Sequence, residues 1–319
     1  MNAVSGSEAG AIDGIPFERD AFAVRMARYA NRVDVELDAI LTVPDVPERR
    51  LFEAMRYSVS AGGKRIRPVI FLAVGDMLGG GSGLMLPFAC ALELIHAYSL
   101  IHDDLPAMDN DDFRRGRPTN HRVFGEAMAI LAGDALLNRS YELMLKSALE
   151  AGTESAVDLA RCVRASRCLA DAAGACGMVG GQVIDMQSEG RQVERNLLER
   201  MHRLKTGALI RAAVASPAIL CGADPEEERA LALYADHLGL AFQIRDDLLD
   251  VLGMEAELGK PVGSDARNGK TTYVTLLGGD GARMALSDAR HDALDALSGF
   301  GSRASFLREM AAFVADRTF

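Results

Sequence analysis

The 319-residue chain contains no tryptophan, and only 6% of its residues are aromatic. Sheets favour aromatic and β-branched residues, whereas the plentiful Ala, Leu and Met of this chain favour helices. Basic residues are also in deficit, since 35 Lys and Arg oppose 45 Asp and Glu for a formal net charge of −10. A nucleic acid or an anionic membrane selects a basic surface, so neither is expected as a partner.

Cysteine is scarce, and its spacing carries no motif. The five cysteines are odd in number and include no CxxC pair: Cys90, Cys162, Cys168, Cys176 and Cys221. This pattern excludes a disulfide framework and a zinc site of the usual spacing. We therefore expect free or buried thiols in a reducing compartment.

Long uninterrupted apolar runs are missing as well. The most apolar stretches contain Glu93 and His96, or Arg211 and Pro217. Residues 1–16 are small, polar and slightly acidic, without the basic and apolar regions of a signal peptide. We expect no stable membrane insertion and a cytoplasmic location.

The hydrophobic periodicity is helical along most of the chain. It predicts helices over residues 17–41, 51–60, 86–103, 125–150, 155–174, 193–220, 226–252, 281–298 and 302–315. No series of alternating, strand-like runs appears between turn signals. We expect an all-α protein: a disordered tail over residues 1–16, and a single large helical bundle over residues 17–319. One domain is favoured because two distant acidic motifs have to be brought together by folding.

The first acidic motif follows an apolar helix. Asp103, Asp104 and Asp109 belong to a run of five aspartates within ten residues. Such a run is most often a solvated loop, because like charges repel. Here Pro106 ends the helix just beyond Asp103 and Asp104, where the helix dipole already disfavours negative charge. A cation is therefore expected at this end, and oxygen ligands favour Mg²⁺.

The second acidic motif lies within a predicted helix. Asp246, Asp247 and Asp250 share one helix face with Gln243. The alternative is a surface helix paired to basic residues, but no Lys or Arg stands four residues beyond any of these aspartates. Since Mg²⁺ binds through carboxylates together with substrate phosphates, two such motifs would clamp a diphosphate.

A basic turn completes the charged features of the first third of the chain. Lys64, Arg65 and Arg67 follow two glycines, and alone they would be interpreted as a solvated loop. His96 precedes Asp103 by seven residues, which places the two about 20° apart around a helix and ~10 Å apart along it. A lone His on an apolar helix is more often core packing, but this position makes a diphosphate contact plausible.

Two later features are weaker. Lys205, Thr206 and Gly207 interrupt an apolar helix, either as a tolerated irregularity or as a bend that directs Lys205 into a cavity. The glycine-rich segment 253–270 contains Lys260 and Lys270 and is expected to form a mobile basic lid.

Together these segments resemble the trans-isoprenyl diphosphate synthases, particularly the bacterial farnesyl diphosphate synthases. The resemblance covers roughly residues 17–315 and is specific, because eight motifs occur in the same order. They are Gly62–Pro68, Glu93–Asp112, Arg114–His121, Phe124–Ala135, Gly180–Asp185, Lys205–Gly207, Phe242–Asp250 and Lys260–Tyr273.

The resemblance implies a set of site residues. Mg²⁺, for which Mn²⁺ is expected to substitute, would be bound by the two acidic motifs: Asp103, Asp104 and Asp109, and Asp246, Asp247 and Asp250. The allylic diphosphate would be held by Arg114, Lys205, Thr206, Gln243 and Lys260, and isopentenyl diphosphate by Lys64, Arg67, His96 and Arg115. The catalytic group would comprise Asp103, Asp104, Asp109, Lys205, Thr206, Gln243, Asp246 and Asp247.

The resemblance also implies a homodimer that makes farnesyl diphosphate, with Tyr98 and Ser99 limiting the chain length. A geranylgeranyl product remains the alternative. A class I terpene cyclase is disfavoured because it needs only one diphosphate site. A silent subunit of a heterodimer is disfavoured because both acidic motifs are intact. Neither the N-terminal tail nor the last residues, 316–319, receive a role.

Overall fold

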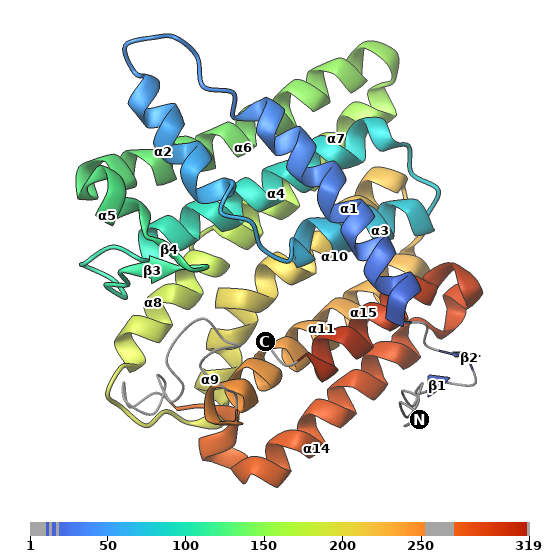
Figure 1. The fold of residues 1–319 in the computed structure, drawn as a ribbon. Coiled ribbons are helices and arrows are strands. Elements are labelled where there is room, and N and C mark those ends of the chain that lie inside the picture. The colour runs from blue at the N-terminus through green and yellow to red at the C-terminus, as the bar shows by residue number, and fades with distance from the viewer. Residues whose placement is uncertain (1–10, 13–14, 17–18, 253–270, 318–319) are drawn as a thin grey trace, which may run out of the picture.

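The chain folds as one layered bundle of helices (Figure 1). The computed structural model describes residues 11–12, 15–16, 19–252 and 271–317. Its helices are α1 (Arg19–Ile40), α2 (Arg49–Val59), α3 (Ile66–Met77), α4 (Ser82–Asp103), α5 (Asn120–Phe124), α6 (Glu126–Glu154), α7 (Ala156–Ala173), α8 (Met178–Ser188), α9 (Arg195–His202), the π-helix η1 (Arg203–Gly207), α10 (Ala208–Cys221), α11 (Pro225–Leu252), α14 (Tyr273–Ala296), the 3₁₀ helix η2 (Ser298–Ala304) and α15 (Ser305–Asp316).

Strand structure in the described residues is confined to two short ladders. β1 (Ala11–Ile12) pairs with β2 (Ile15–Pro16), and β3 (Phe113–Arg114) pairs with β4 (Arg117–Pro118), both antiparallel. The predicted all-α class is confirmed. The first ladder falls within the segment predicted to be a disordered tail.

Several helices differ from the sequence-based expectation: α5 and α8 lie outside every predicted range, and α3 and α14 differ for identifiable physical reasons. For α3, the sequence predicted only a basic turn leading into it and no helix range. α3 is apolar on nearly every side and therefore shows no amphipathic period; ten of its twelve residues are buried. α14 begins at Tyr273 rather than near residue 281. Gly278, with φ of 71°, kinks this helix, so the hydrophobic periodicity of its first turns does not continue into the rest of the helix.

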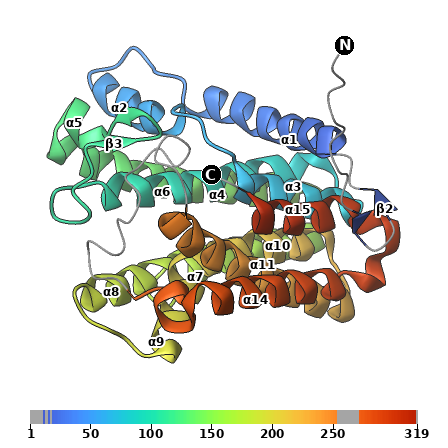
Figure 2. The same cartoon turned by 60° about the horizontal axis from the view of Figure 1, so that its bottom comes forward.

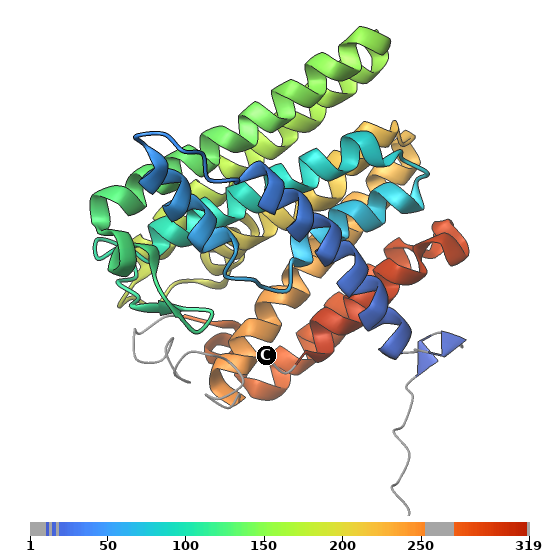
Figure 3. The same ribbon diagram turned by 45° about the horizontal axis from the view of Figure 1, so that its top comes forward.

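The core is centred on α4. Phe88, Leu92 and Ile95 are fully buried where α4 packs against α3, α6 and α10. α1 and α2 lie across the outer face of α3, α4 and α6 (Figure 2). α11 and α14 lie side by side at the other edge (Figure 3). All five cysteine thiols are unpaired, as predicted.

Two helical segments of the described chain are long and apolar enough to cross a bilayer, which the sequence analysis did not expect. They are Gly83–Asp103 and Arg195–Cys221, and 67% and 50% of their apolar windows are buried inside the bundle. Core helices of soluble proteins have the same composition, so these two carry little weight as membrane spans.

Candidate active site

The first acidic motif lies at the C-terminal end of α4. Beyond the helix, the chain folds back so that the amide of Asp109 donates to the carbonyl oxygen of Asp103 at 2.8 Å. The pKa of Asp103 is raised to about 6, mainly by burial; Lys205 opposes this rise, while Asp109 and Asp104 contribute to it. A carboxylate that is costly to ionise gains most from a nearby cation.

A hairpin next to this motif carries the predicted arginines. Arg114 on β3 donates from Nε to Oδ1 of the buried Asp104 at 2.6 Å. The two residues between the strands, Arg115 and Gly116, have φ of 53° and 73°, as a two-residue type I′ turn requires. The turn directs Arg115 across to the carbonyl oxygen of Gly62, at the start of the basic turn.

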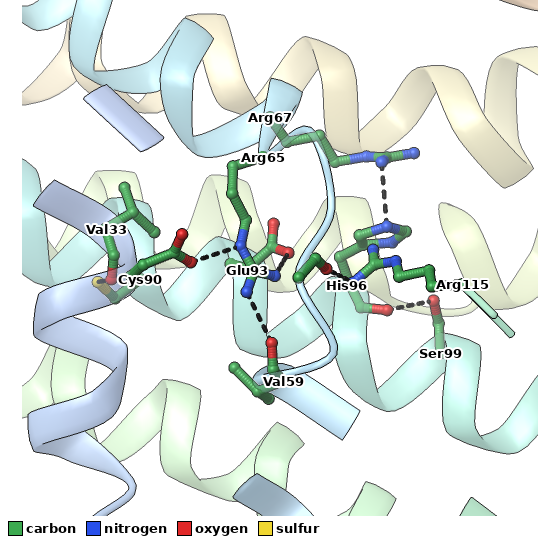
Figure 4. Close-up of polar contacts among 11 residues, drawn as sticks. Val33, Val59, Arg65, Arg67, Cys90, Glu93, His96, Ser99 and Arg115 are labelled. Carbon is green, nitrogen blue, oxygen red and sulfur yellow. Dashed lines mark hydrogen bonds and ion pairs between the residues drawn. The ribbon is translucent and has the colours of Figure 1, made fainter. Parts of the chain in front are cut away.

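The basic turn contains one arginine with a structural role. Arg65 donates to Glu93 at 2.6 Å, to Asp34 at 2.8 Å and to the carbonyl oxygen of Val59 at 2.6 Å (Figure 4). Its side chain is almost completely buried, and its partners lie on α1, α2 and α4. These contacts fix the turn that carries the neighbouring Lys64 and Arg67.

Arg67 and His96 form the centre of a partly buried cluster of basic side chains. Arg67 Nη1 lies 3.3 Å from His96 Nε2, and Arg115 lies beside the His96 ring (Figure 4). Burial, followed by Arg67 and Arg115, holds the pKa of His96 well below its usual value, which favours the uncharged ring. The Nε atom of Arg67 is buried without a hydrogen-bond partner among the described residues. Such a group is complementary to an anion.

The second acidic motif lies on α11 and is held by the chain that follows it. Oδ2 of Asp247 accepts a hydrogen bond from the amide of Tyr273 at 2.6 Å, and Asp250 is buried. Asp246 pairs with Arg317 at 2.5 Å. The guanidinium of Arg317 also lies 3.9 Å from the centre of the Phe242 ring.

Sequence reasoning gave Arg317 no role, and neither its spacing nor its neighbours could have shown this contact. Burial, and then Arg317, lower the pKa of Lys64 to about 8, while Asp246 opposes them. The basic turn and the second acidic motif therefore meet in space, although almost two hundred residues separate them.

The predicted interruption of the long helix is present as the π-helix η1 between α9 and α10. Lys205, on η1, donates from Nζ to Oδ2 of the buried Asp185 at 2.5 Å. Gly181 allows this approach, because a Cβ atom there would overlap the amide nitrogen of Lys205. Asp185 received no role from the sequence; the glycine pair preceding it was the available signal.

The remaining predicted residues are placed less completely. Thr206 lies on η1 next to Lys205, and Gln243 is half-buried on α11 one turn before Asp246 and Asp247. Lys260 lies outside the described residues. Among the described residues, no three His, Cys, Asp or Glu side chains are grouped closely enough to hold a metal ion by themselves.

The residues proposed to limit chain length lie on α4. Tyr98 is buried and packs edge-on against His102, with ring centres 5.7 Å apart. His102 in turn occupies the space that a Cβ atom on Gly133 of α6 would need. Ser99 donates to the carbonyl oxygen of His96 at 2.9 Å.

The family model of the polyprenyl synthetases matches residues 48–292. The chain belongs to the polyprenyl synthetase family. This polyprenyl synthetase is 52% identical to the farnesyl diphosphate synthase of Geobacillus stearothermophilus, over 75% of this chain and 78% of that protein. It is 42% identical to the geranylgeranyl diphosphate synthase of Cyanophora paradoxa, over 91% of this chain and 95% of that protein.

Among solved structures, an apo FPP/GFPP synthase from Zymomonas mobilis matches this polyprenyl synthetase with a TM-score of 0.82 and 36% identity, covering 93% of this chain and 99% of that one.

Proposed function

We propose that this polyprenyl synthetase condenses isopentenyl diphosphate with dimethylallyl or geranyl diphosphate to give (2E,6E)-farnesyl diphosphate. The observation that carries the proposal is the cluster of the partly buried Arg67 and His96 with the exposed Arg115, next to two acidic motifs that are each close to further cations. One diphosphate could then bind at these cations while another is held at the aspartates. A reaction between two diphosphate substrates requires two such sites.

Magnesium fits the donor set. Asp104 is buried and Asp103 is half-buried, burial raises the pKa of both carboxyls, and a hard divalent cation prefers oxygen ligands of this kind. We propose that both acidic motifs hold Mg²⁺, through Asp103, Asp104, Asp109, Asp246, Asp247 and Asp250. When bound, the metal would supply charge neutralisation to the leaving diphosphate. Mn²⁺ is expected to substitute for it.

Other side chains of the protein would position the two substrates and stabilise the charge that develops. Arg114, Lys205 and Lys260 would position the allylic diphosphate, while Thr206 and Gln243 would stabilise positive charge on the allylic carbon. A different set, with Lys64, Arg67, His96 and Arg115, would orient isopentenyl diphosphate for attack by its double bond. The proton lost afterwards would go to the released diphosphate, because none of the described side chains is assigned as the base.

Farnesyl is favoured as the product because the buried Tyr98 ring would close the path of a longer tail along α4. The likeness to a geranylgeranyl diphosphate synthase keeps the longer product as the second candidate. We also propose a single domain over residues 17–319, a cytoplasmic location and a homodimer. Exposed apolar side chains on α6 and α7 support the dimer, among them Leu145, Leu149, Val157 and Val163.

One experiment tests the reaction. The purified protein is incubated with isopentenyl diphosphate, Mg²⁺ and each allylic diphosphate in turn, and the products are identified by mass spectrometry. We expect farnesyl diphosphate from both the dimethylallyl and geranyl primers. Cyclic hydrocarbons, or no elongation of any primer, would contradict the proposal.

A further inference from the structure

A cavity lies outside the proposed reaction site, between α7, α10 and α11 and against η1. Its volume is about 840 Å³, and it is called the outer cavity below. Of the described residues assigned to either substrate or to Mg²⁺, none lines it. Pockets that bind small organic molecules typically have volumes of this order.

The walls of the outer cavity are amphipathic. Ala208, Ala212 and Leu240 contribute an apolar surface. Four arginines line the cavity against three carboxylates, in a protein whose formal net charge is −10; they are Arg164, Arg167, Arg203 and Arg211. Three of them are paired with carboxylates, whereas Arg203 is exposed and pairs with no described carboxylate.

Two buried polar atoms in the same cavity wall lack partners. The hydroxyl of Tyr273 and Nδ1 of His202 make no hydrogen bond within the described residues, although both atoms are buried. Their rings are tilted against each other with centres 5.5 Å apart. Buried polar atoms are nearly always satisfied, and an unpaired one costs roughly 1–3 kcal/mol. Both atoms are covered in this structure, so a bound molecule with a hydrogen-bonding group would remove that cost after a small displacement of the two rings.

The electrostatic surroundings favour a neutral imidazole at this place. Burial, with Lys205 acting in the same direction and Asp185 against it, lowers the pKa of His202 to about 4. Charge recognition in the outer cavity therefore depends on the arginines. The tyrosine hydroxyl supplies a donor, and the neutral ring supplies a donor or an acceptor according to its tautomer.

We propose that the outer cavity binds an amphipathic organic anion, with its anionic group at Arg203, its apolar body against α10 and α11, and a hydrogen-bonding group at Tyr273 and His202. This site adjoins the reaction site through shared elements. Lys205 lies on η1 three residues after His202, and the amide of Tyr273 holds Asp247. A bound molecule would therefore contact η1, which carries Lys205, and Tyr273, whose amide holds Asp247.

The test is a binding measurement that needs no turnover, so it remains informative if the proposed reaction is wrong. The probe is 8-anilinonaphthalene-1-sulfonate, titrated by fluorescence into the full chain with Mg²⁺ and inorganic diphosphate present to occupy the reaction site. We expect one saturable site. Tyr273→Phe and Arg203→Gln should each weaken binding roughly two- to tenfold, the loss of one hydrogen bond or charge contact.

The matched control is Arg200→Gln, which removes an exposed arginine of α9 that does not line the cavity and should leave affinity within about twofold. The melting temperature of Tyr273→Phe should be unchanged or higher, because the substitution removes a buried hydroxyl that has no partner to lose. Unchanged affinity in both test variants, or equal losses in the control, would overturn the proposal. Affinity that falls with rising protein concentration would do the same, since a second copy would then cover the cavity.

Discussion

The backbone of Gly181 on α8 lies so close to η1 that a Cβ atom on Gly181 would overlap the amide nitrogen of Lys205. This close approach places Lys205 Nζ 2.5 Å from Asp185, in the same helix as Gly181. We predict that Gly181→Ala separates the two segments and lowers kcat/KM for the allylic diphosphate roughly tenfold or more, since small displacements of positioning groups are costly.

The matched control for this variant is Gly83→Ala in the first turns of α4. A Cβ atom there meets nothing within 4 Å, so activity and stability should be retained or slightly improved. Steady-state kinetics with varied allylic diphosphate provide the measurement. A Gly181→Ala enzyme with normal kcat/KM would show that the position of η1 is unimportant.

The metal-clamp hypothesis predicts that Asp103→Ala and Asp247→Asn each lower turnover roughly a hundredfold or more at saturating Mg²⁺. Asparagine is chosen at position 247 because it can still accept from the buried amide of Tyr273, so folding should survive. Circular dichroism checks the fold and product assays check the rate. Near-normal turnover in both variants would rule the clamp out.

Arg67 is predicted to bind isopentenyl diphosphate. Arg67→Ala should raise KM for isopentenyl diphosphate roughly tenfold or more and affect the allylic primer much less, because a charge-assisted contact contributes about 1.5–3 kcal/mol. Arg28→Ala, which removes an exposed arginine of α1, is the control. Equal increases for both substrates would mean that Arg67 belongs to neither site specifically.

Tyr98 is predicted to limit the product. Tyr98→Ala should shift the product from farnesyl towards geranylgeranyl diphosphate or longer, because removing a buried ring lengthens the pocket along α4. The same change should destabilise the protein by roughly 3–5 kcal/mol. Tyr98→Phe keeps the ring and should keep the farnesyl product. If Tyr98→Ala lowers only the melting temperature and product length stays the same, the ring is ordinary core packing.

Local patterns predicted the all-helical class and the interruption at Lys205, because periodicity, glycine and proline act within a few residues. They failed for α3, which is buried on almost every side and therefore has no polar face to reveal its period. Gly278 similarly concealed the beginning of α14.

Prediction of the candidate active site from the sequence was limited in a similar way. The sequence does not distinguish Arg65 from Lys64 and Arg67. Only the structure shows that Arg65 forms ion pairs with Asp34 and Glu93 and therefore has a structural role. The pairing of Asp246 with Arg317 joins residues 71 positions apart, and that of Lys205 with Asp185 joins residues 20 apart. Such partners are chosen by packing between helices, which no single-sequence spacing rule records.

Arg65 has a consequence for refolding kinetics. Its contacts reach back 31 residues to Asp34 and forward 28 residues to Glu93, so the basic turn is fixed only when α1 and α4 have docked. Isolated helices form within about a microsecond, whereas contacts between distant segments form later. During refolding from denaturant, the helical circular-dichroism signal should therefore return before the affinity for isopentenyl diphosphate.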